Sequence, residues 1–504
     1  MSGSGYASDF AGLSSAARRA QRSAEPLAEP IASATRKSLE RRLKRFIVDA
    51  DSEPLRLFHP RFRQHSRAGD WYGEHAGKWL RAASLAAIRT QDETLLDRVG
   101  SVVAYLAEQQ EPSGYLGTYA EDAPCRFTSG LGGRTWDLWV HAWLIKGLLA
   151  AEGAGVEGAL PVAERIADLL LETFGSGSCS LLDQGNHAGL SSAVLIEPLA
   201  ELAVTAGRSD IADLARGAVE AMEERGIWIL SGPERGTDVA ELGTGKSYQI
   251  CWVLAGLVAL YRWGGKGEML RAASYYWRSI RDDHLTPLGG PWGGIATHKE
   301  VFNAKGFFSP YGLVETCSAQ SWMALSRELY LETGEGQYLQ EAQKTLVNTI
   351  LGAQDENGED WCYFTFPNGR RNNTYHWACC KSSGALALEE AALIPTASRT
   401  LDAVQVIPHT YTLDHHGQEI VRTDYACVAR GPYVYATALL DGFRKEETLR
   451  LPRLNPESVF HEAGEEKLEL RLPGREPILF EPYYKAGGRH DGAWRSTWLQ
   501  VAWQ

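Results

Sequence analysis

The amino-acid sequence predicts a mainly α protein, an (α/α)6 toroid or barrel followed by a small antiparallel β-sandwich. A pattern of two helices joined by a short polar turn recurs along most of the 504 residues. After Pro395 the hydrophobic residues change to the alternating spacing that is expected of β-strands. We therefore predict a loose N-terminal segment over residues 1–35, a helical domain over residues 36–395 and a β-sandwich domain over residues 396–504.

The helical repeat is marked by short polar turns between amphipathic helices. The marker residues are Gln91, Gly153, Gly207, Gly265 and Gly334, at spacings of 62, 54, 58 and 69 residues. Neither helix of a pair can bury its apolar face alone, so neighbouring pairs must pack together. Five units are visible, and a sixth would combine the helix after Cys380 with N-terminal helices. An open helical solenoid is the alternative arrangement of such pairs.

Local patterns predict the individual elements. A basic helix is predicted over residues 35–50, with its charged face in solvent. Apolar residues at i, i+3 and i+4 predict a helix through Trp322, and Gly334 is a suitable residue to end it. Strands are predicted at residues 404–407, 425–429, 434–437, 468–472 and 497–503.

The composition is that of a globular protein, with 44% hydrophobic and 23% charged residues. The net charge of −12 argues against nucleic acid and anionic membranes as partners. No apolar run reaches the roughly 18 residues that a membrane span needs. The first ten residues lack a signal-peptide pattern, and eight cysteines do not form a dense disulfide framework. We expect a cytoplasmic protein with reduced thiols, although a chain that had lost its signal peptide would look the same.

Two adjacent cysteines, Cys379 and Cys380, define the candidate functional site. They precede a helix that is predicted from about Ser382 to Leu393, for which Ser382 or Ser383 is a suitable N-cap. The start of a helix favours the thiolate form of a cysteine. Thiolate is the form that both metal binding and nucleophilic attack require.

The stretch Glu315-Thr-Cys317 adds a carboxylate and a third thiol. Residues two apart cannot share one face of a regular helix, but both can point inward from an extended segment or a first helical turn. Three thiolates and a carboxylate suit a tetrahedral zinc ion. The alternative is that Cys317, Cys379 and Cys380 are small buried hydrophobic residues, as free cysteines usually are. The spacing alone leaves both interpretations open.

Further motifs occur in a fixed order with these two. Gly293-Gly-Ile-Ala-Thr-His-Lys-Glu300 precedes Glu315-Thr-Cys317, which precedes Cys379-Cys380. Shorter motifs are Lys78-Trp-Leu80, Gly114-Tyr-Leu-Gly-Thr-Tyr119, Arg430-Gly-Pro-Tyr-Val-Tyr435 and Pro482-Tyr-Tyr484. Together they resemble glycoside hydrolase family 127, the β-L-arabinofuranosidase family. The resemblance covers most of the chain and implies an (α/α)6 barrel followed by β-sandwich domains.

The resemblance also implies the chemistry. Glu315, Cys317, Cys379 and Cys380 would bind zinc, and Cys379 would attack the anomeric carbon to form a thioglycosyl intermediate. Glu300 would be the general acid and then the general base of a retaining two-step mechanism. Zinc would keep Cys379 as a thiolate at neutral pH. The implied function is a zinc-dependent retaining exo-glycosidase that hydrolyses a small furanoside of the β-L-arabinofuranoside type.

The sugar pocket departs from the family pattern. Where the family has histidines that line the barrel, this sequence has Trp136 and Trp143, Ala193 and Lys246. A tryptophan replaces a hydrogen bond by a stacking face, and Lys246 would favour an acidic sugar or a sugar phosphate. The residues predicted to contact the substrate are His298, Tyr363, Trp136 and Lys246. For the last three, an ordinary packing role is an equally good interpretation.

Other functions stay open. The same chemistry could act on a different sugar, acidic or substituted. A lyase or epimerase with a toroid fold would use a His or Tyr base and would need no thiol cluster. A non-catalytic glycan-binding or zinc-storage protein is a third alternative. A homodimer also stays open as the oligomeric state.

Overall fold

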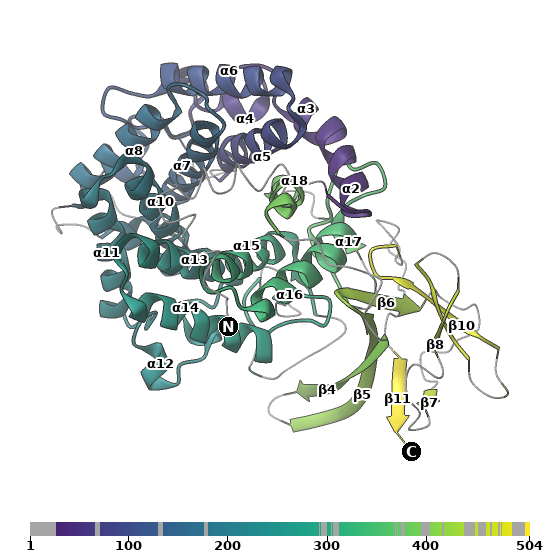
Figure 1. Ribbon diagram of the computed structural model, residues 1–504. Helices are drawn as coiled ribbons and strands as arrows, with labels where there is room; N and C mark the ends of the chain where they lie inside the picture. Colours follow the sequence, from purple (N-terminus) through teal and green to yellow (C-terminus); the bar gives the residue numbers. More distant parts are fainter. Residues whose placement is uncertain are drawn as a thin grey trace, which may run out of the picture. The chain divides into compact units, whose positions relative to one another are not determined.

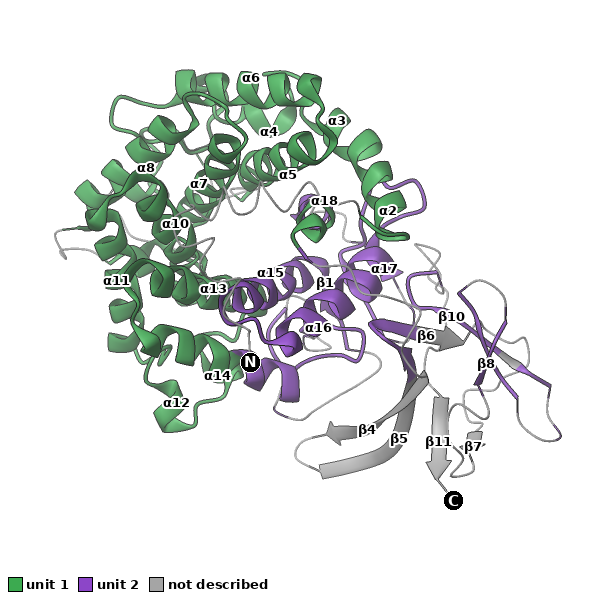
Figure 2. Ribbon diagram, viewed as in Figure 1, with its two compact units in different colours: residues 1–276, 388–393 green, residues 277–387, 394–504 purple. Residues whose placement is uncertain are grey.

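The computed structural model forms two compact units, which are described separately (Figure 2). The first comprises residues 1–276 and 388–393, and the second comprises residues 277–387 and 394–504. The domain boundaries at residues 35 and 395 remain predictions. The structure describes residues 27–65, 71–129, 135–175, 180–291, 293, 300–303, 305, 312–367, 369, 371–373, 379–394, 404–415, 418–437, 449–451, 460–463, 466–471, 474, 476–485 and 499–503. The described chain is mostly helical with small, largely antiparallel sheets, which confirms the predicted mainly α class.

The first unit is helical (Figure 1). Its helices are α2 (Ile31–Ser38), α3 (Lys44–Phe46), α4 (Glu53–Arg56), α5 (Glu74–Thr90), α6 (Glu93–Gln109), α7 (Asp137–Gly153), α8 (Ala159–Phe174), α9 (Leu190–Ala193), α10 (Ile196–Ala206), α11 (Ser209–Glu224), α12 (Gly232–Arg235), α13 (Ser247–Gly264) and α14 (Gly267–Asp283), which runs on into the second unit. A π-helical turn, Leu39–Leu43, joins α2 to α3. The predicted basic helix is therefore present, but it begins at Ile31 rather than at residue 35.

Long helices of the first unit alternate between two degrees of burial. Helices α5, α7, α10 and α13 contact one another in chain order and are buried along nearly their whole length. Helices α6, α8 and α11 pack outside them and bury one stripe each (Figure 1). The predicted markers Gln91, Gly207 and Gly265 end α5, α10 and α13 in the left-handed backbone conformation that terminates helices. Gly153 is instead the last residue of α7.

The second unit continues the helix pairs. Its helices are α15 (Thr316–Thr333), α16 (Gly336–Thr345), α17 (Leu351–Ala353) and α18 (Cys379–Glu390), with a π-helical turn at Leu346–Ile350 and a 3-10 turn at Ala391–Leu393. Helix α15 is buried along its length and α16 packs against it. Gly334 ends α15 with a φ of 71°, as predicted.

A three-stranded antiparallel sheet combines one strand that precedes α15 in the chain with two strands that follow α17. It consists of β1 (Val314–Glu315), β2 (Phe364–Thr365) and β3 (Arg371–Asn372), with β2 in the centre. Glu315 pairs with Phe364, and Phe364 pairs with Asn372. The sequence did not predict this sheet, because two-residue strands are too short for an alternating pattern to be visible.

The C-terminal segment forms a larger sheet. Its strands are β4 (Val404–His415), β5 (Gln418–Arg430), β6 (Tyr433–Thr437), β7 (Leu449–Leu451), β8 (Phe460–Glu462), β9 (Leu468–Leu470), β10 (Ile478–Pro482) and β11 (Leu499–Trp503). Their order is β7-β11-β5-β6-β10-β9-β8, with β4 beside β5, and all described pairs are antiparallel except β7 with β11. The predicted strands coincide with β4, β5, β6, β9 and β11. A two-layer sandwich remains a prediction.

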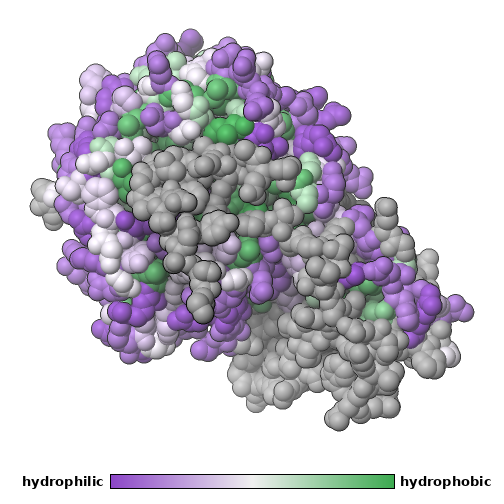
Figure 3. Space-filling view, viewed as in Figure 1, coloured by the Kyte–Doolittle hydropathy of each residue, from purple (hydrophilic) through white to green (hydrophobic). Residues whose placement is uncertain are grey.

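The described surface is largely hydrophilic in the face shown in Figure 3. The large hydrophobic side chains that lie exposed in the described part are Val48, Phe62, Trp228 and Leu331, which are far apart in sequence. None of the described helices combines the length and the apolar character that crossing a lipid bilayer requires.

Candidate active site and metal centre

Two helix starts bring the predicted metal ligands together. Strand β1 ends at Glu315, and α15 begins with Cys317 in its first turn. Helix α18 begins at Cys379, so Cys379 and Cys380 also lie in a first turn. One donor atom from each of Glu315, Cys317, Cys379 and Cys380 lies within 4.8 Å of the other three. The three thiols and the carboxylate therefore form a cluster that could hold a metal ion, and their role as zinc ligands stays a prediction.

The predicted start of α18 was wrong. Ser382 and Ser383 lie inside the helix, which begins three residues before the first of them, so neither is its N-cap. Ser383 instead accepts a hydrogen bond from the Cys317 thiol, with 3.3 Å between Sγ and Oγ. Cys379 and Cys380 themselves form the start of the helix, which places both thiols at the positive end of its dipole.

The Tyr363 carbonyl oxygen connects the two helix starts. It accepts a hydrogen bond from the Thr316 backbone N–H at 3.0 Å and one from the Cys380 thiol at 3.8 Å. The Thr316 hydroxyl donates to the Cys362 carbonyl at 2.8 Å. These contacts tie the segment before β2 to the first turns of α15 and α18.

A close contact fixes the position of α18. Gly384 lies in this helix, and a Cβ atom built there would come within 2.3 Å of the Trp361 ring. Both residues are buried. A side chain larger than a hydrogen atom at position 384 would therefore push the helix, together with its two cysteines, away from Trp361.

The four donors differ in accessibility. Glu315 is 6% exposed, and Cys317 and Cys380 are each 1% exposed, whereas Cys379 is only partly buried. Ser318 donates a hydrogen bond to Oε2 of Glu315 at 2.7 Å, and the sulfur atoms of Cys317 and Cys380 are 3.3 Å apart. Cys379 is therefore the member of the cluster that a substrate can reach most easily.

Burial and neighbouring thiols act on the protonation of the cluster. Burial raises the pKa of the Cys380 thiol well above its usual value, and hydrogen bonds with Cys317 and Cys379 raise it further. A positive ion among these groups would act in the opposite direction and favour thiolates. Three sulfur atoms and one carboxylate oxygen are also the donor set that zinc accepts. The residues of this cluster thus fit a metal ion.

Tyr363 and Glu300 lie within electrostatic reach of the cluster. Burial raises the pKa of the Tyr363 hydroxyl well above its usual value, followed by the charges of Cys379, Glu315, Cys380 and Glu300 in that order. Glu300 itself is 3% exposed and is not one of the four clustered donors. The second unit therefore brings together the carboxylate of Glu300, the phenol of Tyr363 and the cluster of four donors.

The other predicted substrate residues lie in the first unit or outside the described residues. Trp136 precedes α7, is partly buried, and makes edge-to-face contacts with Trp139 and His187 at centroid distances of 5.3 and 5.6 Å. Lys246 is the partly buried residue before α13. His298 lies outside the described residues.

Two of the positions that the sequence comparison predicts to replace family histidines are buried. Trp143 is 1% exposed, and the Nζ atom of Lys78 lies 4.8 Å from its ring centroid. Ala193, at the end of α9, is fully buried. Sequence reasoning missed the supporting residues Ser318 and Ser383, because serine near a helix start is expected to be a cap.

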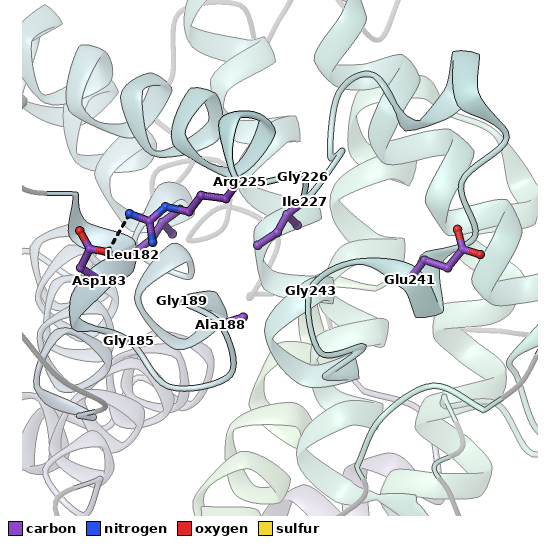
Figure 4. A pocket seen from close by; sticks show the side chains of 10 residues that line it. All are labelled: Leu182, Asp183, Gly185, Ala188, Gly189, Arg225, Gly226, Ile227, Glu241 and Gly243. Atoms are coloured by element: carbon purple, nitrogen blue, oxygen red, sulfur yellow. Dashed lines mark hydrogen bonds and ion pairs between the residues drawn. The ribbon is translucent and has the colours of Figure 1, made fainter.

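One hollow in the described part of the first unit has a volume of about 550 Å³ (Figure 4). Its lining residues are Leu182, Asp183, Gly185, Ala188, Gly189, Arg225, Gly226, Ile227, Glu241 and Gly243. Figure 4 shows the Arg225 side chain directed at Asp183, to which it forms an ion pair of 2.8 Å. None of the predicted site residues lines this hollow.

Comparison with known proteins defines the class. Residues 25–392 match the family model described as "Beta-L-arabinofuranosidase, GH127 catalytic domain". The protein is thus a glycoside hydrolase, and it acts on sugar substrates. The chain belongs to the GH127 β-L-arabinofuranosidase family. The resemblance to this family that the sequence motifs indicated is therefore confirmed. No match is found among curated proteins.

Solved structures share the fold over nearly the whole chain. A GH127 β-arabinofuranosidase is 16% identical, with a TM-score of 0.66 over 98% of this chain and 97% of its own. A GH127 β-L-arabinofuranosidase from Geobacillus stearothermophilus T6 is 14% identical, with a TM-score of 0.65 over 97% of this chain and 99% of its own. A third structure, a glycoside hydrolase, is 12% identical with a TM-score of 0.65 over 95% of this chain and 97% of its own. At these identities the likeness concerns the fold.

Proposed function

We propose that the protein is a retaining exo-glycosidase with Cys379 as nucleophile and Glu300 as acid and base. The proposed substrate is a small furanoside of the β-L-arabinofuranoside type. The observation that carries the proposal is the difference in burial within the cluster, where Cys379 is partly exposed and the other three donors are buried. Four protein ligands would fill a tetrahedral coordination shell, so the nucleophile would have to be one of the ligands, and Cys379 is the most accessible of them.

The fold proposed for this enzyme is an (α/α)6 barrel followed by a β-sandwich. Repeated packing supports it, because α5, α7, α10, α13 and α15 are each buried along their length. The following helices α6, α8, α11 and α16 pack against α5, α7, α10 and α15, respectively. Helix α18 would be the inner helix of a sixth pair. The proposed site then lies where inner helices begin, since all three thiols occupy first turns of α15 and α18.

We propose zinc as the metal, held by Glu315, Cys317, Cys379 and Cys380. When bound, zinc would keep these thiols deprotonated at neutral pH. The protein contributes to the same end, because first helical turns present N–H groups and a positive dipole end to the sulfur atoms. Ser318 orients the carboxylate of Glu315 through the hydrogen bond to Oε2.

The reaction would run in two displacements. In the first, Sγ of Cys379 bonds to the anomeric carbon while the carbon–oxygen bond to the leaving group breaks and Glu300 gives its proton to that oxygen. In the second, Glu300 takes a proton from water, the water oxygen bonds to the anomeric carbon, and the carbon–sulfur bond breaks with its electron pair returning to Cys379. Two inversions at one carbon retain its configuration.

The proposed sugar contacts are Tyr363, Trp136, Lys246 and His298. The raised pKa of Tyr363 keeps its hydroxyl neutral at physiological pH, so the group can donate a hydrogen bond to a sugar oxygen. Trp136 offers a partly exposed aromatic ring for stacking on a sugar face. Lys246 adds the positive charge that would favour an acidic or substituted sugar over plain arabinose.

Two substitutions test the proposal. We expect Cys379→Ser and Glu300→Gln each to lower turnover of the best nitrophenyl furanoside, and removal of the general acid alone to cost about 10²- to 10⁴-fold. Because Glu300 is not a ligand, Glu300→Gln should keep wild-type zinc content by metal analysis. Cys125→Ser, which alters a buried thiol in the first unit, is the control and should keep full activity.

A screen of nitrophenyl glycosides tests the identity of the substrate. Nitrophenyl furanosides and pyranosides, neutral and acidic, are compared with wild-type enzyme. Faster turnover of an acidic sugar would replace the arabinofuranoside by an acidic substrate without changing the mechanism. Unchanged turnover after both Cys379→Ser and Glu300→Gln would contradict the mechanism itself.

A further inference from the structure

The sheet β1–β2–β3 is too short to hold its own position. Each strand has two residues, whereas strands in globular proteins usually have about five or six. The sheet nevertheless carries two groups of the site. Glu315 is the last residue of β1. Tyr363 directly precedes β2, and its carbonyl oxygen accepts hydrogen bonds from Thr316 and Cys380. Side chains outside the sheet must therefore fix it in place.

Arg371, the first residue of β3, connects the sheet to one such side chain, that of Tyr483. Arg371 is 2% exposed, and a buried guanidinium group needs hydrogen-bond acceptors. Its Nε donates to the Gly352 carbonyl at 2.7 Å, and its Nη1 donates to the Gly369 carbonyl at 3.0 Å. Nη1 also donates to the hydroxyl of Tyr483, and Nη2 donates to the Tyr483 carbonyl at 3.3 Å. The guanidinium thus joins β3 to the residue that follows β10.

Tyr483 contacts both ends of the loop between β2 and β3. Its hydroxyl donates to the Phe366 carbonyl at 2.6 Å, one residue after β2, and accepts from Arg371 at the start of β3. Its ring centroid lies 4.1 Å from Cζ of Arg371, which adds a cation–π contact. The residue is fully buried. The Tyr483 hydroxyl therefore connects the residue that follows β2 to the first residue of β3.

Tyr483 is itself firmly anchored in the second unit. Its backbone N–H donates to the Val434 carbonyl at 2.8 Å, and its side chain packs with Leu288 and Ala429. Strand β6 is in turn held by Asn348, which donates to the Pro432 carbonyl at 2.8 Å and accepts from the Val434 N–H at 2.9 Å. The support behind the loop is therefore a network of hydrogen bonds to backbone groups, which reaches the side chain of Asn348 in the π-helical turn Leu346–Ile350.

We propose that Tyr483 is a positioning residue of the metal centre, acting through Arg371 and the β2–β3 loop on the sheet that carries Glu315. The inference rests on the proposed metal site and assigns a role in it to the C-terminal β-segment. The path is short, because Phe366 follows Thr365, and Thr365 pairs with Val314 next to Glu315. Loss of the Tyr483 hydroxyl would release the loop. Two groups at the cluster would then be held less firmly, namely the Glu315 carboxylate and the Tyr363 carbonyl that accepts from Cys380.

The test compares two neighbouring tyrosines in the full-length protein. Tyr483→Phe keeps the ring but removes both hydroxyl contacts, and we expect zinc affinity, measured by competition with a chromogenic chelator, to fall about 10-fold, as for other groups that support metal ligands. Tyr484→Phe is the matched control. Its hydroxyl donates to Glu466 at 2.9 Å, so its loss should leave zinc affinity unchanged.

The outcomes separate the inference from the proposed function. Zinc affinity equal to wild type in folded Tyr483→Phe, or an equal loss in Tyr484→Phe, would overturn the positioning role and leave the metal site intact. A wild-type protein that binds no zinc would overturn the metal site and the inference with it. If Tyr483→Phe does not fold, Arg371→Lys, which keeps the charge and removes the planar fork, replaces it with the same expected loss of affinity.

Discussion

The buried polar groups of the two units balance their charge in different ways. In the first unit, buried carboxylates face cations of the chain itself. These pairs are Glu74 with Lys78 at 3.0 Å, Glu197 with Lys146, Glu389 with Arg89 at 2.8 Å, and Glu390 with Arg81 at 2.8 Å. The second unit also has such a pair, Arg327 with Glu328 at 2.7 Å, but in addition it gathers four acidic donors within 4.8 Å of one another, where burial and then neighbouring thiols raise the pKa of Cys380.

This difference separates a structural use of buried charge from a functional one. Pairs such as Lys146 with Glu197 are complete within the protein, so they fix how neighbouring helices pack. The cluster of Glu315, Cys317, Cys379 and Cys380 brings together groups that repel one another when ionised. Without a bound cation this repulsion lowers the stability of the folded chain. Strongly perturbed acids gathered at one place are typical of functional sites. The comparison leads to different expectations for removing charge in each unit.

The largest effect should follow from Lys146→Met. The Nζ atom of Lys146 pairs with Glu197 and lies 3.4 Å from the Trp252 ring centroid, and both charged residues are buried. Removing one partner leaves the other charge buried, which costs about 3–5 kcal/mol of unfolding free energy. Lys146→Met with Glu197→Gln should regain most of this loss, as measured by urea denaturation. A single variant as stable as wild type would show that the pair is not needed for charge balance.

A smaller effect is expected from zinc on the stability of the wild-type protein. Free zinc at about 100 times its dissociation constant should raise the unfolding free energy by about 2.7 kcal/mol, because only the folded chain assembles the four donors. A chelator should reverse the gain, and Cys317→Ser should abolish it. The double variant at Lys146 and Glu197 should show the full gain. A gain that survives Cys317→Ser would place the zinc elsewhere.

The sequence was sufficient for the parts of the molecule that depend on local patterns. Gln91, Gly207, Gly265 and Gly334 marked predicted turns because short polar segments separate the apolar stripes of two helices there, and in the structure each ends a helix. The four donors were recognised from residue type and order. Their assembly within 4.8 Å depends on contacts between distant segments, which spacing alone does not define.

The remaining features are tertiary and leave little trace in sequence. Serines at 382 and 383 are good caps by type, yet the helix begins at Cys379, and Ser383 contacts Cys317. Gly384 gives no local signal either, because its role is the close approach of Trp361 from another segment. The predicted contacts Trp136 and Lys246 belong to the first unit, so their part in the site stays a prediction.

The smallest effect, counted per pH unit, separates the two kinds of buried acid by the pH dependence of the unfolding free energy. Burial raises the pKa of Glu389 to about 7 from a usual value of 4.5, with Arg89 opposing the shift. Between these values the folded protein holds a proton that the unfolded chain has released, so the unfolding free energy falls as pH rises, by up to about 1.4 kcal/mol per pH unit.

Glu389→Gln removes this contribution, and its stability should fall less than that of wild type between about pH 4.5 and 7, as measured by denaturation at each pH. Asp137, whose pKa burial also raises to about 7, would keep part of the slope. Stabilisation by zinc should have the opposite sign, growing with pH because the metal competes with protons for the thiols. Equal slopes for the variant and the wild-type protein would show that Glu389 is ionised throughout, like the carboxylate of a fully balanced pair.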